Sequence, residues 1–273
     1  MITSMLWAHI ITPIALFLGS LKLFVLLLDT IGYIRMYYLT SKVNHLERYG
    51  GKGTWALVTG STDGIGLEFC RQLARDGFNI CLVSRTESKL KAVIEGELSQ
   101  FGVQLRYVIA DFAQNSKMKY YDRIMSEVQD IDVGLVIVNA GVANVGKVAE
   151  IEIEKLEQML DVNVYQYSML THKFASRLEA RKAAHSGIIL LSSVTAHLPG
   201  AISGVTYHAS KVFVKYLAQA MAYESSLSTG KRSKIDLLCL QPGFVKTKMI
   251  KFAEEKKLDF GVVPTDTCVA DSL

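Results

Sequence analysis

The amino-acid sequence predicts an α/β protein in which one doubly wound parallel sheet of about six strands follows an N-terminal hydrophobic membrane segment. From Thr54 onward, short apolar runs alternate with segments of helical periodicity. Strands that alternate with helices pair in parallel through right-handed crossovers, and runs that are apolar throughout are typical of strands covered on both faces. We therefore expect a membrane anchor over 1–35, a linker over 36–53 and one folded domain over 54–273.

The N-terminal segment holds most of the hydrophobic excess of the chain. Residues 5–21 contain no Lys, Arg, Asp or Glu, and the first charges that follow are Lys22 and Asp29. A spanning helix needs about 20 mostly apolar residues, and a span that ends near Lys22 lets this side chain snorkel to the boundary. We expect a single membrane span, and the alternative is a hydrophobic hairpin in one leaflet, bent at Pro13. A signal peptide is disfavoured because residues 1–4 carry no basic side chain.

Charge patterning indicates the orientation of this anchor. Basic residues follow the hydrophobic segment and none precedes it; they are Arg35, Lys42, Arg48 and Lys52. The positive-inside bias therefore places the C-terminal bulk of the chain in the cytoplasm. The net charge of the whole chain is only +4 and its basic residues are scattered, so nucleic-acid binding has little support.

The cysteines indicate a reducing compartment. They are Cys70, Cys81, Cys239 and Cys268, and they show neither a CxxC pair nor His/Cys ligand spacing. This pattern predicts free thiols, with no zinc site and no disulfide framework.

The strands and helices of the domain can be placed from their periodicity. The expected strands are 54–59, 78–84, 104–111, 133–141, 187–193 and 234–243. The expected helices are 66–77, 87–100, 115–129, 149–183 and 206–227. Gly77 is suited to end the first helix, and Thr86 can cap the second, with Glu87 in its first turn.

A glycine-rich turn follows the first strand. Its glycines are Gly60, Gly64 and Gly66, and they come directly before the first helix. In a doubly wound sheet this is where a dinucleotide diphosphate lies on the amides of a helix N-terminus. The spacing is G-x-x-x-G-x-G and not the common G-x-G-x-x-G, so the ordinary fingerprint does not transfer directly. The alternative is a turn without a ligand.

The end of the second strand indicates which dinucleotide would bind. An NAD site usually places an acidic residue there for the ribose diol, but this chain has Ser84 and Arg85. An arginine can meet a 2′-phosphate with its planar fork. The pattern therefore favours NADPH, and the alternative is that Arg85 is a solvated loop residue.

A second group of residues indicates the chemistry. Tyr207 and Lys211 are four residues apart on an expected helix, so they share one face. Ser193 ends the fifth strand, and "PGFVKT" ends the sixth. Because ligands bind at the carboxyl ends of the strands of such sheets, these elements converge on one crevice.

At this point the chain is identified as similar to the classical short-chain dehydrogenase/reductase family, which has a Rossmann-type fold. Within it, the chain resembles the membrane-anchored branch of 17β-hydroxysteroid dehydrogenases types 3 and 12 and very-long-chain 3-oxoacyl-CoA reductases. The features that carry the resemblance are the hydrophobic segment, "YGGKGTWALVTGSTDGIG", "SRT", "YHASK" and "TKM". They cover nearly the whole chain and are far more specific for the family than for a substrate.

The resemblance implies the site residues. The residues matching the family's cofactor site are Gly60, Ser61, Thr62, Gly64, Ile65, Gly66, Arg85, Asp111, Asn139, Tyr207, Lys211, Pro242, Gly243 and Thr247. Within this set, Asp111 matches the contact to the adenine edge, and Asn139 begins "NAG", which supports the sheet beside the cofactor. The residues matching the catalytic tetrad are Asn163, Ser193, Tyr207 and Lys211. No metal is implied.

The implied chemistry is reduction of a ketone. Tyr207 would act as general acid, and the charges of Lys211 and of the oxidised nicotinamide would lower its pKa from about 10. A decrease of roughly 3 units corresponds to about 4 kcal/mol. Ser193 would hold the carbonyl oxygen, and Asn163 would hold a water that relays protons through Lys211.

Some residues depart from the family pattern or compete for a role. Ser192 competes with Ser193, which we prefer because it is closer to the family's usual spacing from the tyrosine. Val138 stands where the family usually has an asparagine. His197 and His208 have no carboxylate partner in view, so we interpret them as structural or solvated.

The resemblance also sets expectations for the whole protein. In this branch a substrate-loop helix and a seventh strand come later in the chain, whereas this sequence ends at Leu273, so we expect six strands. We expect an NADPH-dependent reductase of a lipophilic ketone, a 17-oxosteroid or a long-chain 3-oxoacyl-CoA, at the endoplasmic reticulum membrane with its domain facing the cytosol. The alternative is a catalytically weak membrane-bound binding or scaffold protein. The helices expected over 149–183 and 206–227 match those along which family members pair as homodimers, and the sequence leaves the oligomeric state of this chain open.

Overall fold

The computed structural model describes residues 7–38, 43–113, 117–144, 146–183, 185–198, 204–227, 233–250 and 261–273. The chain divides into two compact units, residues 1–44 and residues 45–273. Each unit is described by itself.

The first unit is a hydrophobic helix. A π-helical turn over Trp7–Ile11 leads into α2, which runs unbroken over Thr12–Tyr38. Pro13 lies in the first turn of α2, where its missing N–H costs nothing, so it begins the helix and does not bend a hairpin. Among the described residues, one helix is long and apolar enough to cross a membrane, His9–Gly32. This agrees with the predicted anchor.

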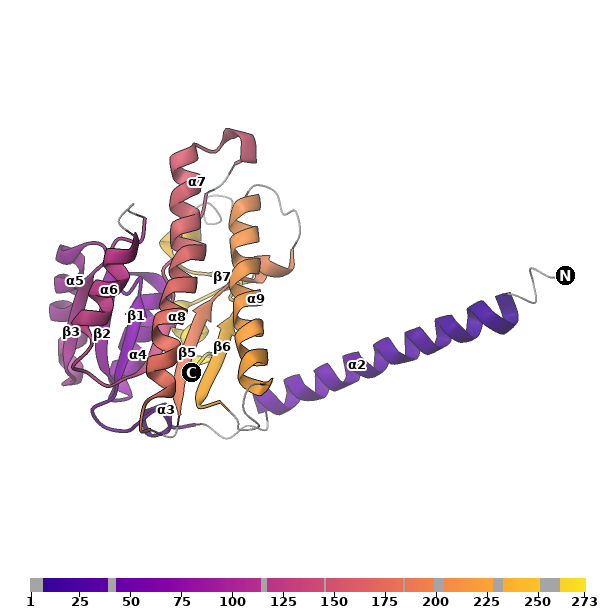
Figure 1. Ribbon diagram of the computed structural model, residues 1–273, viewed down its shortest axis with the longest axis horizontal. Coiled ribbons are helices and arrows are strands. Elements are labelled where there is room, and N and C mark those ends of the chain that lie inside the picture. Colours follow the sequence, from indigo (N-terminus) through magenta and orange to yellow (C-terminus); the bar gives the residue numbers. More distant parts are fainter. Residues whose placement is uncertain are drawn as a thin grey trace. The chain divides into compact units, whose positions relative to one another are not determined.

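The second unit is built on a parallel sheet of six strands (Figure 1). The strands are β1 Trp55–Thr59, β2 Asn79–Ser84, β3 Leu105–Ile109, β4 Val133–Val138, β5 Ser186–Leu191 and β6 Ile235–Leu240. Their order is β3-β2-β1-β4-β5-β6. The order reverses between β1 and β4, and the crevice beyond the carboxyl ends of these strands is where such sheets bind ligands. The predicted doubly wound fold is confirmed.

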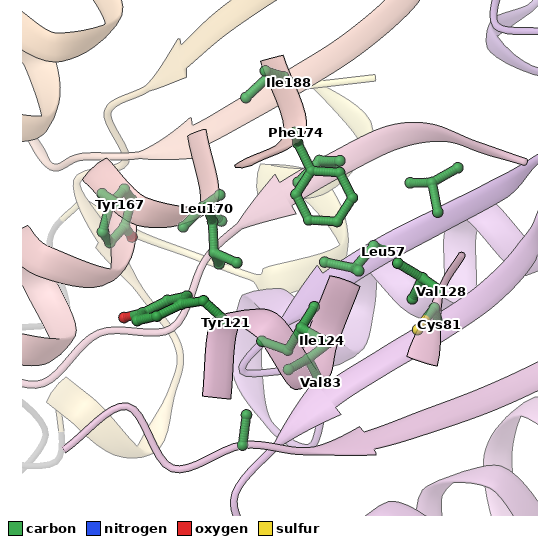
Figure 2. Packing of buried hydrophobic residues seen from close by; sticks show 14 of the residues in the cluster. Leu57, Cys81, Val83, Tyr121, Ile124, Val128, Tyr167, Leu170, Phe174 and Ile188 are labelled. Atoms are coloured by element: carbon green, nitrogen blue, oxygen red, sulfur yellow. The ribbon is translucent and has the colours of Figure 1, made fainter. Parts of the chain in front are cut away.

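Helices cover both faces of the sheet because side chains alternate along each strand. Leu57 and Val83 belong to one core cluster, whereas Val58 and Leu82 belong to the other. The first cluster lies under α6 (Lys117–Glu127), α8 (Gln166–Glu179) and α9 (Val205–Leu227), and the second lies under α4 (Gly64–Arg75) and α5 (Glu87–Val93). Figure 2 shows Ile124 of α6 and Phe174 of α8 beside strand residues of the first cluster.

The helix boundaries differ from the prediction in two places. The expected helix over 87–100 is α5 followed by a π-turn and a 3-10 turn, and Thr86 precedes it without a side-chain capping bond. The expected helix over 149–183 divides into α7 (Ile153–Leu160), a π-turn over Asp161–Tyr165, and α8. The first helix ends as predicted, with Gly77 at a φ of +96°. Residues 115 and 116 lie outside the described residues.

Part of the predicted linker belongs to the folded unit. Helix α3 (His45–Arg48) precedes Tyr49, which is buried in the core. The carbonyl of Tyr49 accepts a bond of 2.7 Å from the buried Arg181, and Arg48 donates to Asp236 of β6 at 2.9 Å. The compact unit that contains the sheet therefore begins at His45.

The C-terminal part of the unit contains elements that the periodicity did not predict. Strand β7 (Phe244–Val245) pairs in parallel with β8 (Val262–Val263), and a short helix, α11 (Thr265–Ala270), packs against α4. Val269 is fully buried in the second core cluster. These contacts hold α11 beside α4.

Candidate functional site

The fold brings the four predicted catalytic side chains to one end of the sheet. Asn163 lies in the π-turn before α8, and Ser193 follows β5 at the start of a 3-10 turn. Tyr207 and Lys211 lie one turn apart at the start of α9. The four side chains come from three separate segments of the chain, so only the tertiary fold makes them neighbours.

Lys211 is a buried cation. Only 4% of it is exposed, and its Nζ donates to the carbonyl oxygen of Leu191 at 2.9 Å. The same nitrogen lies 5.6 Å from the ring centroid of Tyr207 and 5.4 Å from that of Tyr167. Because burial disfavours the ammonium, the pKa of Lys211 is lowered to about 8. Lys211 can therefore take up and release a proton near neutral pH.

The pKa of Tyr207 in the protein alone differs in direction from the pKa expected when Lys211 and an oxidised nicotinamide act together. Burial raises the pKa of the phenol above its ordinary value, and a side-chain hydrogen bond with Ser193 acts in the opposite direction. The expected lowering by Lys211 is absent because its ammonium binds the Leu191 carbonyl and lies against the ring face. In the protein alone, Tyr207 is a neutral phenol, the form that a general acid needs.

The two serines after β5 have different partners. The Ser192 hydroxyl donates to the carbonyl oxygen of Lys211 at 2.6 Å, so it fixes the backbone of α9. Ser193 bonds with Tyr207 through its side chain and accepts from the amide of Thr195 at 3.2 Å. These contacts favour Ser193 as the group that meets a substrate oxygen.

Asn163 is fully buried and holds the segment that follows β4. Its Oδ1 accepts from the amide of Val142 at 2.9 Å, and its Nδ2 donates to the Val142 carbonyl at 2.8 Å and to the Ser210 hydroxyl at 3.1 Å. A Cβ added at Gly141 would lie 3.5 Å from both Asn163 Oδ1 and Lys211 Nζ. Both N–H groups of the Asn163 side chain therefore donate to protein atoms, and the second lone pair of Oδ1 can accept from a water.

The glycine turn fits a dinucleotide diphosphate. Gly64 has a φ of +54°, in the left-handed region that favours glycine. A Cβ on Gly66 would lie 2.4 Å from the carbonyl oxygen of Gly60, so no side chain is accommodated there. The turn thus exposes backbone at the N-terminus of α4, where the helix dipole favours an anion.

The residues expected on the adenosine side lie at the carboxyl ends of β2 and β3. The Thr62 hydroxyl is 3.2 Å from the Ser84 hydroxyl, which ties the glycine turn to β2. Arg85 follows Ser84 and is exposed. Asp111 follows β3, and its carboxylate accepts from the amide of Ala113 at 3.1 Å. An exposed arginine at this position can reach a 2′-phosphate.

The other expected cofactor residues have structural contacts as well. Ser61 is buried and donates to the Val83 carbonyl at 3.4 Å, and Ile65 packs on the second core cluster. The Pro242 carbonyl accepts from the amide of Val194 at 3.0 Å, which joins the ends of β5 and β6. Gly243 is exposed. These contacts fix the segments that follow β1, β5 and β6.

Thr247 lies directly over the glycine turn. A Cβ added at Gly64 would lie 3.0 Å from the Thr247 Cγ2 atom. The next residue, Lys248, forms an ion pair with Asp63 in the same turn, at 2.5 Å. The segment after β7 is therefore held against the start of α4.

Sequence reasoning missed a group of buried residues that support the site. The Thr59 hydroxyl accepts from the amides of Asn139 and Ala140, both at 3.0 Å, and Asn139 Nδ2 donates back to the Thr59 carbonyl at 2.9 Å. Gln166 is fully buried beside Thr59, and its Oε1 has no hydrogen-bond partner among the described residues. The signal for Thr59 was a polar residue that closes an apolar run.

Tyr167 and Ser210 also support the catalytic group. Tyr167 is fully buried and donates to the Leu191 carbonyl at 3.0 Å, the acceptor that Lys211 also uses. Burial raises the pKa of Tyr167 well above its ordinary value, so it stays a neutral donor. Ser210 donates to the Tyr207 carbonyl at 2.7 Å while it accepts from Asn163. Ser210 joins two members of the tetrad.

The histidines and cysteines lie outside this network. His197 is 2.6 Å from Gln241 and 3.3 Å from Lys215, and His208 is 3.3 Å from the Leu198 carbonyl. All four cysteines are free, and burial raises the pKa of Cys81 to about 12. Within the described ranges, no group of three His, Cys, Asp or Glu side chains is placed to hold a metal ion.

Comparison with known proteins identifies the family. A family model described as short chain dehydrogenase matches residues 54–258. The chain therefore belongs to the short-chain dehydrogenase family, whose members bind a nicotinamide dinucleotide.

The chain is similar to several curated relatives. It is 33% identical to a very-long-chain 3-oxoacyl-CoA reductase of Podospora anserina, over 80% of this chain and 64% of the relative. It is 31% identical to hydroxysteroid dehydrogenase-like protein 1 of Gallus gallus, over 84% of this chain and 67% of the relative. The chain thus spans about two thirds of the length of these relatives.

Solved structures support the same fold. A 7β-hydroxysteroid dehydrogenase aligns with a TM-score of 0.71 at 24% identity, over 83% of this chain and 85% of that chain. A short-chain dehydrogenase from Sphingobium yanoikuyae in complex with NADPH aligns with a TM-score of 0.67 at 25% identity, over 80% of this chain and 82% of that chain.

Proposed function

We propose that the protein is an NADPH-dependent reductase that converts a ketone on a lipophilic substrate to an alcohol. The observation that carries this proposal is the buried network of Asn163, Ser193, Tyr207 and Lys211 at the carboxyl end of the sheet, beside the glycine turn. A binding or scaffold protein has no need to bury a lysine and align it with a phenol at this position.

The protein's own part of the reaction is orientation and proton transfer. Ser193 holds the carbonyl oxygen and places it beside the phenol of Tyr207, which donates the proton. The cofactor, when bound, supplies the hydride and, once oxidised, a positive charge near the phenol. Both Ser193 and that charge favour the phenolate that remains after proton transfer.

Lys211 restores the proton to Tyr207. Its pKa of about 8 allows the amine to exchange protons near neutral pH. The remaining lone pair of Asn163 Oδ1 can hold a water between this amine and solvent. Lys211 and Asn163 therefore form the inner end of a proton relay.

The cofactor would be held by the glycine turn and by residues on either side of it. Gly60, Gly64 and Gly66 would carry the diphosphate, and Arg85 would meet the 2′-phosphate of NADPH. Asp111 would face the adenine, and Thr247 the nicotinamide side.

The substrate would be a 3-oxoacyl-CoA of long chain length or an oxosteroid. One named relative is a very-long-chain 3-oxoacyl-CoA reductase and another is a hydroxysteroid dehydrogenase-like protein, and the hydrophobic helix His9–Gly32 suits a substrate that partitions into a membrane. We propose the endoplasmic reticulum membrane as the location because the chain resembles the membrane-anchored branch of the family. We propose that the domain faces the cytosol, since basic residues follow the helix and none precedes it.

We also propose a homodimer. The solvent face of α9 exposes the aromatic residues Phe213 and Tyr216, at 37% and 64%. Exposed aromatic side chains on one helix are typical of protein interfaces. Light scattering of the purified protein, corrected for detergent, tests this assembly.

The test of the reaction is NADPH oxidation by the purified full chain with 3-oxoacyl-CoAs and with oxosteroids, with NADH as a control. Tyr207→Phe removes the proton donor while it keeps the ring, so we expect turnover to fall by about 10²-fold or more while NADPH still binds. Turnover that survives this substitution, or its absence with both substrate classes despite bound NADPH, would contradict the proposal.

A further inference from the structure

The glycine turn contains a carboxylate where the cofactor's diphosphate would approach. Asp63 is the residue before α4, and its Oδ1 accepts from the amide of Gly64 at 2.9 Å. The side chain therefore occupies a position beside the helix N-terminus that favours anions. A second anion at this turn would meet like-charge repulsion unless the Asp63 charge is compensated.

Lys248 provides this compensation from a distant part of the sequence. Its Nζ lies 2.5 Å from Asp63 Oδ2. Lys248 begins the 3-10 turn after Thr247, and Thr247 in turn packs against Gly64. An ionic contact and an apolar contact thus hold the same segment against the glycine turn.

The surrounding charges make Lys248 the specific partner of Asp63. The two residues line a cavity of about 320 Å³, together with Arg71 and Lys246. The guanidinium of Arg71 donates hydrogen bonds to Glu68 and Glu97. Asp63 is the acidic residue in the cavity lining, and Lys248 is the cation that contacts it.

The small contribution of an exposed ion pair to stability argues against a role of Lys248 and Asp63 in folding. The side chains of Lys248 and Asp63 are 72% and 50% exposed. Exposed ion pairs contribute little to stability, so the consequence of this pair is local. It acts on the charge at the turn and on the position of Thr247.

We propose that Lys248 is a positioning residue for the cofactor: it neutralises Asp63 and holds the Thr247 segment on the glycine turn, so that the dinucleotide diphosphate can bind there. The proposal rests on the proposed function as far as the cofactor is concerned, and it does not depend on the substrate.

The two partners should have opposite effects on cofactor affinity. Lys248→Ala leaves the Asp63 charge uncompensated, so the Kd for NADP+ should rise about three- to fivefold at low salt. Asp63→Asn keeps an acceptor for the Gly64 amide and removes the repelling charge, so the Kd should fall or stay within about twofold. The double variant should bind more tightly than Lys248→Ala alone.

Calorimetric titration of the full chain in detergent with NADP+, without substrate, measures these effects. Runs at about 50 mM and 500 mM salt separate the charge effect, which should shrink as screening increases. Lys246→Ala is the matched control, because it removes the same charge from the wall of the same cavity and should change the Kd by less than about twofold. Lys248→Arg keeps the ion pair and should restore the affinity.

Three results would overturn the proposal. If Lys248→Ala and Asp63→Asn weaken NADP+ binding equally, the ion pair has only a structural role. If Lys246→Ala and Lys248→Ala weaken NADP+ binding equally, the effect comes from the overall positive charge of the cavity wall and not from the pair. Wild-type protein that binds no NADP+ would remove the proposed function and this inference together. Protein that binds NADP+ but reduces no ketone would contradict the proposed reaction alone, since the Kd values of the variants would still test the role of Lys248. Thermal unfolding of each variant verifies that it is folded.

Discussion

Replacement of Lys211 by methionine should stabilise the protein while it abolishes turnover. Methionine has a similar length and no charge, so it fills the same buried position, which is 4% exposed in the wild type. Burial lowers the pKa of Lys211 from 10.5 to about 8. Each pKa unit corresponds to 1.36 kcal/mol, so keeping the ammonium buried at pH 7 costs about 3 kcal/mol.

The substitution also removes a hydrogen bond of the buried ammonium. The hydrogen bond from Nζ to the Leu191 carbonyl is lost, at a cost of about 1 kcal/mol. The Leu191 carbonyl does not become an unsatisfied buried group, because Tyr167 still donates to it at 3.0 Å. The net gain at pH 7 is therefore about 2 kcal/mol, which corresponds to a rise in Tm of about 4–8 °C for a domain of this size.

The gain should depend on pH in a defined direction. Below pH 8 both the folded and the unfolded wild-type chains are protonated at Lys211, so the full penalty is present. Between pH 8 and 10.5 the unfolded chain holds more protons, so the wild type becomes more stable relative to the variant as the pH rises. At pH 10 the advantage of Lys211→Met should fall to within about 1 kcal/mol of zero.

The assay is unfolding of wild type and Lys211→Met in the same detergent, at pH 7 and at pH 10. The function of the residue is checked in parallel by NADPH oxidation. A variant that is less stable than wild type at pH 7 would refute the reasoning. A difference in Tm that is the same at both pH values would refute it as well, since the penalty would then not come from the ammonium.

Two further predictions concern neighbouring groups. Ser193→Ala should lower kcat by about 10²–10³-fold, because it removes the donor to the substrate oxygen. Ser192→Ala should mainly lower stability, by about 1 kcal/mol, since Ser192 donates to the Lys211 carbonyl. Steady-state kinetics and thermal unfolding of both variants check this, and the reverse pattern would assign Ser192 the catalytic role. Arg85→Ala should raise the Kd for NADPH about tenfold or more and change the Kd for NADH by less than about twofold, because only NADPH carries the 2′-phosphate. A fluorescence titration measures both Kd values. An equal loss of affinity for both cofactors would indicate that Arg85 is a solvated loop residue.

The sheet could be predicted from the sequence because its signal is local. Each strand is an apolar run bounded by turn residues, and each crossover helix has its own periodicity. The division of 149–183 could not be predicted, because the π-turn Asp161–Tyr165 keeps the helical pattern of its neighbours. This turn places Asn163 in the site, and π-turns within helices are frequent at functional sites.

The strands β7 and β8 could not be predicted for a different reason. Each has two residues, Phe244–Val245 and Val262–Val263, which is too short for any periodic signal. Their pairing depends on a contact between segments that are distant in the sequence. The same holds for Thr59, whose role is visible only once Asn139 and Ala140 are placed beside it.

The direction of the Tyr207 pKa is a further case in which spacing was insufficient. The four-residue spacing of Tyr207 and Lys211 predicted correctly that they share a face, but not where the ammonium points. That direction is set by a third element, because the Leu191 carbonyl ends β5 and accepts from Nζ.

The Leu191 carbonyl explains how a buried lysine is tolerated at this site. A carbonyl oxygen has two lone pairs, and here one accepts from Lys211 and the other from Tyr167. The Tyr167 ring also lies 5.4 Å from the ammonium, so the same residue stabilises the charge by its π face and shares its acceptor. This support reduces the penalty of burial but does not remove it, since the pKa stays at about 8. A lysine with less support would be neutral and could not return a proton, and one with full support would not release it. The incomplete stabilisation of Lys211 therefore fits the proton exchange with Tyr207 that we propose for it near neutral pH.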